Sequence, residues 1–313
     1  PEVITADARG TMIALDPDGR PVLEIRATTY RLSPPAVGDI DGDGTPEIVF
    51  GTEDKEIHCV DAAGRHRWTR PVEARFGRSL PLVADADGDG AYEVYVSSSY
   101  NQARPGLFAL DAATGAPRWK AESNLQAYDS TAVADLDGDG TTEILFGDKN
   151  TRLYRVDARG QRVWSTQLGG RGIFFAPAVA DLNGNGAATV FAVVRASGPE
   201  GFGLYLLDPA GKVREGVALP GGGVASPALC RFKGSPEVRL LSHSGSGKLL
   251  CYRLAHDPAR ARILWAGLRN DREQTGFVAS RAPRPKPAAA PRNQDAAPSA
   301  ASQAQAVSGT NRL

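Results

Sequence analysis

Cysteine, methionine and histidine are scarce in this 313-residue chain, which has three, one and four of them. Three cysteines cannot build a disulfide framework. Cys59 and Cys251 occupy matching places in two repeats, so we expect buried free thiols. The chain also lacks any run of about 18 apolar residues, which excludes a transmembrane helix on the sequence pattern. Its 42% hydrophobic and 23% charged residues are typical of a globular protein.

Catalytic signatures are also missing from the sequence. The four histidines form no HExxH motif and the cysteines form no CxxC motif. GSGK, at Gly245 to Lys248, lacks the spacing and the Ser or Thr of a phosphate-binding P-loop and is interpreted as a turn. We interpret His58, in an apolar run, as structural, and His243 as solvated.

Glycine and proline are abundant instead, with 35 and 22 copies. This inventory favours many short strands joined by turns over packed helices. The predicted fold class is therefore all-β.

Charge is balanced overall, with 36 basic and 36 acidic residues, but it is unevenly placed. Thirteen of the acids lie in four short Gly-rich loops, which leaves 23 acids against 36 Lys and Arg elsewhere. With the loops neutralised by cations, the remaining surface is mildly basic, which suits acidic polysaccharide, phospholipid or nucleic acid. No basic cluster selects among these, so there is no specific nucleic-acid signal.

The acidic loops recur at a regular interval. They read DIDGDGTPE from Asp39, DADGDGAYE from Asp85, DLDGDGTTE from Asp135 and DLNGNGAAT from Asp181, so their spacings are 46, 50 and 46 residues. Periods of this length are typical of propeller blades. Around each loop lie a small apolar lead, two apolar runs, an Asp-x-x-Gly step and, in most units, a Trp.

The apolar runs predict strands buried on both faces, because they are nearly continuous instead of alternating. Four short strands per unit make a β-propeller blade, and the Asp-x-x-Gly steps suit the hairpin between its third and fourth strands. All four tryptophans, Trp68, Trp119, Trp164 and Trp265, are predicted on fourth strands. Each would bury about 200 Å² against the next blade as an anchor.

The ends of the repeat region set the blade count. Residues 1–25 match the later half of a unit, so we expect the sequence to begin inside a repeat and any secretion signal to lie upstream. Residues 224–265 form a degenerate unit. Six blades result, with Gly276 to Ser280 supplying the missing first strand of the opening blade and closing the ring. A seventh blade is the competing possibility.

Two regions follow from these boundaries. Residues 1–280 are predicted to be the β-propeller. Residues 281–313 contain ten Ala and five Pro without apolar periodicity, and we expect a disordered tail.

The acidic loops predict a metal site. A cluster of four carboxylates requires protons, a basic partner or a cation, and no basic residue lies within the loop. Oxygen donors at positions 1, 3, 5, 7 (backbone carbonyl) and 9, with Gly at position 6, are the pattern of a calcium loop. Position 12 is apolar, so the loop should join two strands instead of the two helices of an EF-hand. The expected ligands are Asp39, Asp41, Asp43, Thr45 and Glu47; Asp85, Asp87, Asp89, Ala91 and Glu93; and Asp135, Asp137, Asp139, Thr141 and Glu143.

The remaining loops are weaker. In the fourth, Asp181, Asn183, Asn185 and the Ala187 carbonyl keep oxygen donors, but Thr189 replaces the acid at position 9. We therefore expect three Ca²⁺ sites and a weaker fourth. The degenerate unit has Lys233 in its loop and should bind none.

The units resemble FG-GAP or VCBS repeats, the calcium-loop blades of integrin α-subunit heads and bacterial surface proteins. The resemblance lies in the three full loops, in Phe50-Gly51 and Phe146-Gly147 after two of them, and in Pro35-Ala36 and Pro177-Ala178 before the first and fourth loops. It implies a propeller with calcium in peripheral loops and a non-catalytic adhesion or scaffolding role. ALDAATGAPRW, Ala109 to Trp119, is also similar to the Trp-docking motif of PQQ-type propellers, which implies blade packing and not the quinone.

The sequence hypothesis is a non-catalytic, calcium-binding, monomeric propeller that binds protein or polysaccharide at its loop face. Calcium sites of extracellular affinity would be empty in the cytosol, so we expect an extracytoplasmic location: secreted, periplasmic or cell surface. The alternative is part of an enzyme, either a polysaccharide lyase or a PQQ-dependent dehydrogenase.

Overall fold

The short apolar runs form strands, and Asp- and Gly-rich turns separate them. The computed structural model describes residues 3–76, 79–98, 104–127, 131–173, 175–195, 202–267 and 277–278. These residues contain 24 strands and no helix. Accordingly, no helix in the described part of the chain is long and apolar enough to span a membrane.

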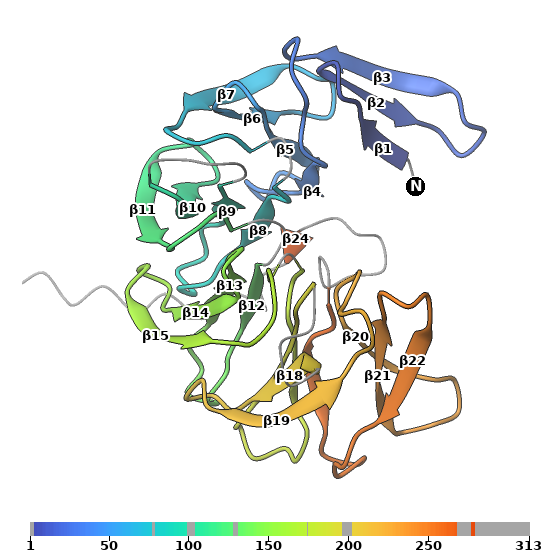
Figure 1. Ribbon diagram of the computed structural model, residues 1–313. Helices are drawn as coiled ribbons and strands as arrows, with labels where there is room; N and C mark the ends of the chain where they lie inside the picture. The colour runs from blue at the N-terminus through green and yellow to red at the C-terminus, as the bar shows by residue number, and fades with distance from the viewer. Residues whose placement is uncertain are drawn as a thin grey trace, which may run out of the picture.

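The strands form six sheets in an arc, which Figure 1 shows from the first sheet at the upper right to the last at the lower right. The first sheet contains β1 (Val3–Ala6), β2 (Thr11–Leu15) and β3 (Pro21–Arg26), and the second contains β4 (Ala36–Gly38), β5 (Glu47–Gly51), β6 (Glu56–Val60) and β7 (His66–Pro71). The third contains β8 (Leu82–Ala84), β9 (Glu93–Ser97), β10 (Gly106–Asp111) and β11 (Pro117–Glu122), with β24 (Phe277–Val278) beside β8.

The fourth sheet contains β12 (Ala132–Ala134), β13 (Glu143–Gly147), β14 (Arg152–Val156) and β15 (Arg162–Gln167). The fifth contains β16 (Ala178–Asp181), β17 (Thr189–Val193), β18 (Phe202–Leu207) and β19 (Val213–Ala218), with β23 (Arg262–Trp265) beside β16. The sixth contains β20 (Ala228–Arg231), β21 (Val238–His243) and β22 (Leu249–Arg253).

Within each sheet, consecutive strands pair antiparallel, as in a propeller blade. The second strands β5, β9 and β13 are buried along their whole length, which confirms that their unbroken apolar runs are covered on both faces. The all-β propeller fold with four-stranded blades is therefore confirmed.

Tryptophans join neighbouring sheets as predicted at three interfaces. The indole Nε1 of Trp68, Trp119 and Trp164 donates to the carbonyl oxygens of Ala112, Ala158 and Pro209, at 2.9, 2.8 and 2.8 Å. Each acceptor directly follows the Asp of the turn in the next sheet. The indole therefore combines apolar burial with a satisfied N–H, as a buried Trp requires.

The glycine of the same turn provides room for the indole. A Cβ added at Gly115, Gly160 or Gly211 would lie 2.5 to 2.6 Å from the ring of the tryptophan packed on it. At the interface between the first and second sheets, aliphatic side chains take the place of the indole. Leu23 and Ile25 lie 3.0 and 3.1 Å from a Cβ added at Gly64.

The fourth tryptophan is not where the sequence pattern predicts it. Trp265 lies on β23, which pairs with β16 at the inner edge of the fifth sheet instead of extending the sixth. There the ring is fully buried, and Asp257 N donates to the Leu182 carbonyl to hold the preceding turn against the fifth sheet. Both this edge and the β22 edge of the sixth sheet offer free backbone groups, but the edge of β16 adds an apolar core, whereas β22 is exposed or half-buried along its length.

The expected closing strand is also placed differently. β24 lies within the segment Gly276 to Ser280, but it pairs parallel with β8 and not with the first sheet. Its neighbours in that segment, and the tail from residue 281, lie outside the described residues. In the described part of the chain the first and sixth sheets stand at opposite ends of an open arc (Figure 1).

The two matched cysteines differ in burial. Cys59 is buried, as expected, but Cys251 is exposed. Cys251 lies on β22, whose residues alternate between exposed and half-buried because no further sheet of the described chain covers it.

We predict that Gly160→Ala lowers the free energy of unfolding by about 2 to 4 kcal/mol. About 1 kcal/mol comes from placing a Cβ at positive φ, and the rest from contact with Trp119. Gly19→Ala is the matched control, because Gly19 has the same φ (78° against 77°) and nothing lies within 4 Å of its added Cβ. Denaturant unfolding of the two variants measures the difference, and equal losses would contradict a packing role for Gly160.

Candidate metal-binding loops on one rim

The acidic loops connect the first and second strands of four consecutive sheets. In a four-stranded meander this connection lies on the same rim as the turn between the third and fourth strands. The carboxylates at loop position 1 organise the backbone: Asp39 accepts N–H groups from Gly42 and Gly44 at 2.7 and 3.0 Å. Both glycines have positive φ, which explains the second and fourth residues of the Asp-Gly-Asp-Gly pattern. Asp85 and Asp135 make the same pairs of bonds.

The glutamates at position 9 begin the second strands and point back to the loop. Glu47, Glu93 and Glu143 are 2 to 4% exposed. The Oε2 atom of each accepts the backbone N–H that follows the first Asp, at 3.0, 3.3 and 3.0 Å. One carboxylate oxygen is thus fixed by the backbone, and the other is left for a cationic partner.

Each loop brings three carboxylates together. The ligand atoms lie within 4.8 Å of one another in three groups: Asp39, Asp41 and Asp43; Asp85, Asp87 and Glu93; and Asp135, Asp137 and Glu143. All are hard oxygen donors, the type that calcium prefers. The described structure therefore assembles the predicted residues into groups capable of holding a metal ion.

Some predicted ligands lie outside these groups. Asp89 and Asp139 are missing from the second and third, and Glu47 from the first. Asp89 and Asp139 instead accept the N–H of position 7, Ala91 or Thr141, at 2.7 Å, and Asp43 accepts that of Thr45 at the same distance while also belonging to its group. This hydrogen bond fixes the backbone of the position-7 residue near the end of the loop.

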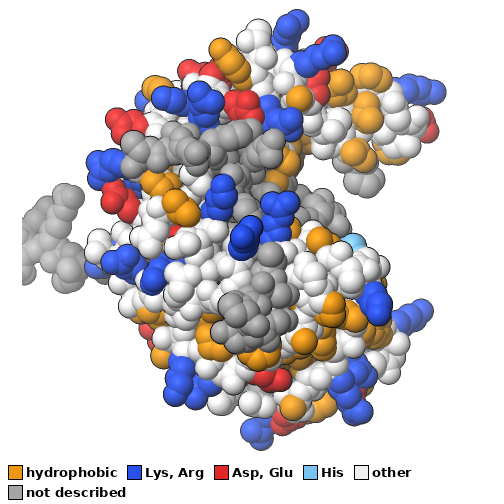
Figure 2. All heavy atoms as spheres, in the orientation of Figure 1, with side chains coloured by type: hydrophobic (Ala, Val, Ile, Leu, Met, Phe, Trp, Pro, Cys, Tyr) orange, Lys and Arg blue, Asp and Glu red, His pale blue; other side chains and the backbone are white. Residues whose placement is uncertain are grey.

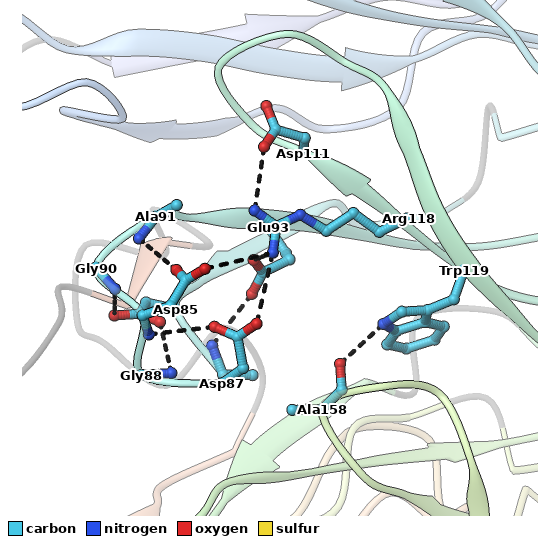
Figure 3. Close-up of polar contacts among 12 residues, drawn as sticks. Asp85, Asp87, Gly88, Gly90, Ala91, Glu93, Asp111, Arg118, Trp119 and Ala158 are labelled. Atoms are coloured by element: carbon cyan, nitrogen blue, oxygen red, sulfur yellow. Dashed lines mark hydrogen bonds and ion pairs between the residues drawn. The ribbon is translucent and has the colours of Figure 1, made fainter. Parts of the chain in front are cut away.

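An arginine pairs with each of these carboxylate groups, which the sequence analysis did not anticipate. Arg118 on β11 lies 2.7 Å from Glu93, 3.5 Å from Asp87 and 3.1 Å from Asp111 (Figure 3). Arg67 on β7 lies 2.5 Å from Asp41 and 2.6 Å from Glu47. No basic residue lies within the loop sequence, but the fold brings an arginine to each loop from another strand.

In two sheets the sequence signal for this arginine is its place directly before the anchor tryptophan, as in Arg67-Trp68 and Arg118-Trp119. Alternate strand residues point to opposite faces, so Trp119 reaches the next sheet while Arg118 reaches its own loop (Figure 3). The fourth sheet has Val163 in that place. Its arginine is Arg155, on the neighbouring strand opposite Trp164, 2.6 Å from Asp137 and 2.9 Å from Glu143.

Burial shifts the pKa of Glu93 and Glu143, two of the position-9 acids. Desolvation raises the pKa of Glu93 to about 7, and it also raises the pKa of Glu143 and of Asp87. Arg118 opposes this shift at Glu93, but the Oε1 atom makes no hydrogen bond despite the ion pair. These carboxylates can therefore bind a further cation in addition to the arginine.

The fourth loop is built differently. Asp181 is buried and accepts N–H groups from Asn183, Gly184, Asn185 and Gly186. Arg262, on β23, lies 3.1 Å from its Oδ2. With asparagines at positions 3 and 5 and a neutral Ala187 at position 7, this loop carries a single carboxylate that is already paired. It belongs to none of the carboxylate groups found in the described residues.

Three solved structures resemble this fold at low sequence identity. The N-terminal part of BBS1, in complex with ARL6, has a TM-score of 0.56 and 14% identity over 82% of this chain and 78% of that one. The C-terminal domain of PilY1 from Pseudomonas aeruginosa has a TM-score of 0.51 and 15% identity over 85% and 69%. BamB from Moraxella catarrhalis has a TM-score of 0.46 and 16% identity over 82% and 80%.

No curated protein sequence is significantly similar to this chain. A family model does match it. The model is described as outer membrane protein assembly factor BamB and covers residues 53–266, well over half of the chain. This region includes the three tryptophan contacts between sheets, in agreement with the PQQ-like docking motif. The chain therefore belongs to the BamB family of PQQ-like β-propellers.

Proposed function

We propose that this propeller is a non-catalytic scaffold that is stabilised by calcium and presents a macromolecule-binding surface outside the cytoplasm. The observation that carries this proposal is the threefold repetition of one acidic loop geometry on one rim. Ligand atoms in each loop lie within 4.8 Å of one another. A turn needs only one Asp, so three carboxylates gathered in each of three loops indicate selection for a cation.

The donor set fits calcium. Each of the three loops offers three carboxylates within 4.8 Å of one another, and the backbone carbonyl at position 7 is the further ligand that the loop pattern assigns. The resemblance to FG-GAP repeats supports the same ion. Calcium bound there would neutralise the carboxylates that now face Arg67, Arg118 and Arg155. Calcium and these arginines would therefore compete for the same carboxylates.

The proposed location rests on the calcium affinity that is typical of extracellular modules. Extracellular calcium modules have dissociation constants of about 10⁻⁴ to 10⁻³ M. Such sites fill only where calcium is near the millimolar level, which favours a secreted, periplasmic or cell-surface protein. A protein partner is supported by the BBS1 neighbour, which was crystallised in complex with ARL6. A polysaccharide partner remains within the proposal.

The non-catalytic role is supported by the most perturbed histidine. His58 is 3% exposed, and its ring stacks on Phe50 with centroids 5.0 Å apart. Phe146 and Tyr154 stack in the same way at the matching place in the fourth sheet. Burial and the neighbouring His66 lower the pKa of His58 to about 4, so at neutral pH it is an uncharged core residue.

We predict that calcium raises the melting temperature and that EDTA reverses the increase. At 1 mM calcium, each site with a dissociation constant near 10⁻⁴ M contributes about 1.4 kcal/mol. Asp137→Ala should remove about one third of the total increase, because it disables one of three sites. Asp18→Ala, in an exposed turn outside the loops, is the control. A melting curve indifferent to calcium would disprove the metal role.

We predict that Arg118→Gln lowers the melting temperature in EDTA but enlarges the increase caused by calcium. The variant leaves Glu93 without its ion pair in the apo state and removes the competing charge from the loop. Differential scanning calorimetry with and without calcium measures both effects. Arg65→Gln is the control, because Arg65 is an exposed arginine paired with Asp61 in a turn. If the variant showed the same calcium-induced increase in melting temperature as the native chain, arginine and calcium would not share the site.

We predict that His58→Phe reduces the sensitivity of the fold to acid. The folded-state pKa is about 4 against 6.5 for an ordinary histidine, so the unfolded chain alone takes up a proton as pH falls below 6.5. Stability is complete above that pH and is lost toward pH 4. The variant should retain roughly 2 to 3 kcal/mol more of its neutral-pH stability at pH 4.5. Urea unfolding at pH 7.5 and 4.5 tests this, and parallel losses in both proteins would contradict it.

A further inference from the structure

The connection between β20 and β21 in the sixth sheet carries the opposite charge to its counterparts. In the second, third and fourth sheets the connection between the first two strands is an acidic loop, whereas here the residues from Arg231 to Gly234 are Arg-Phe-Lys-Gly. All four are exposed, and Phe232 is 51% exposed. Lys233 makes no hydrogen bond or ion pair with any residue that the structure describes. An aromatic ring and a cation are therefore both accessible to a ligand at this point of the rim.

Four further arginines reach the same rim. β22 runs antiparallel to β21, so the end of β22 and the connection from β22 to β23 lie beside the start of β21. β23 then pairs with β16, where Arg262 stands opposite Asp181 at the start of the fourth loop. A Cβ added at Gly184 in that loop would lie 2.6 Å from the Cβ of Arg260. We use the name basic rim for the six cations that the fifth and sixth sheets bring together here: Arg231, Lys233, Arg239, Arg253, Arg260 and Arg262.

Acidic side chains balance only part of this charge. Three carboxylates pair with four of the arginines: Glu237 with Arg239 and Arg253, Asp257 with Arg260, and Asp181 with Arg262. Arg231 instead donates to the carbonyl oxygens of Pro236 and Ala261, which are neutral. Six cations thus face three carboxylates, and the basic rim keeps a net positive charge. Figure 2 shows Lys and Arg side chains over the lower right of the molecule, where Figure 1 places β21 and β22.

The kind of cation indicates the kind of anion. Five of the six are arginines, and a guanidinium binds a planar oxyanion through two parallel N–H bonds. Arg231 is held by backbone carbonyls and Arg239 by Glu237, so these side chains lose little conformational entropy when they bind. The loop offers a membrane only one apolar side chain, which is too little area for stable insertion. One exposed ring is sufficient, however, to stack on the apolar face of one sugar.

We propose that the basic rim binds an acidic polysaccharide, with Phe232 stacked on a sugar ring and with Lys233 and the neighbouring arginines paired with its carboxylate or sulfate groups. This inference rests on the scaffold role proposed above and names the class of its ligand. The acidic loops of the second, third and fourth sheets repel such a chain, so they confine it to the fifth and sixth sheets. The basic rim itself requires no metal.

Binding is measured on the full chain in EDTA. Dextran sulfate and polygalacturonate are the sulfated and carboxylated probes, and neutral dextran is the control polymer. The chain should bind at least one acidic polymer saturably and at least tenfold more tightly than dextran. Raising the salt concentration from about 50 to about 300 mM should weaken that binding, because salt screens the charges. Lys233→Glu should weaken it about tenfold and Phe232→Ala at least threefold.

Two substitutions toward the opposite rim of the same sheet are the matched controls. Lys248 lies in the turn between β21 and β22, and Leu249, which is 70% exposed, begins β22. Lys248→Glu makes the same change of charge as Lys233→Glu, and Leu249→Ala removes apolar surface as Phe232→Ala does. Both should keep the native affinity within about twofold. All four variants should melt like the native chain, because the substituted side chains are exposed.

Four results would overturn the inference. They are no saturable binding of either acidic polymer, equal losses in Lys233→Glu and Lys248→Glu, native affinity in Phe232→Ala, and tighter binding to poly-L-glutamate or to phosphatidylglycerol vesicles than to the polysaccharides. The last result would assign the basic rim to an acidic polypeptide or to a membrane. Calcium-dependent melting is measured separately, so the inference can fail while the calcium-stabilised scaffold stands.

Discussion

The contact between an indole and a glycine turn is the interaction on which this architecture depends. The inner sheets have two apolar faces, and covering both stabilises the fold. Trp68, Trp119 and Trp164 supply that cover and fix the offset of the next sheet through one hydrogen bond each. The glycine is required because any Cβ in its place would overlap the ring. The offset and spacing of neighbouring sheets and the sequence of the turn therefore all depend on one repeated contact.

The same strands connect the packing between sheets with the charge on the rim. Because side chains alternate along a strand, Trp119 packs on the neighbouring sheet while Arg118 turns to its own acidic loop (Figure 3). In the fourth sheet the two functions converge, since Arg155 and Trp164 both donate to the Pro209 carbonyl. A change in loop charge would therefore act on the arrangement of the sheets. This coupling is the physical basis of the calcium-dependent stability that we propose.

Membership of the BamB family and the likeness to BBS1 and PilY1 place this chain among propellers, a fold that hosts many functions. Beyond the shared fold, the described chain carries acidic loops with arginine partners in three consecutive sheets.

The sequence by itself determined the elements that depend on local chemistry. Apolar runs between Gly and Asp gave the strands, the 46- to 50-residue period gave the blades, and Asp-x-Asp-Gly-Asp-Gly gave loops whose carboxylates converge. Contacts between distant residues were decided only by the tertiary structure. No spacing rule brings Arg155 to Glu143, moves Trp265 to the inner edge of β16, or pairs Phe277 with Val83. These contacts depend on which strand edge or charged group remains unpaired after the other sheets have packed. That is a property of the whole fold and not of any one repeat.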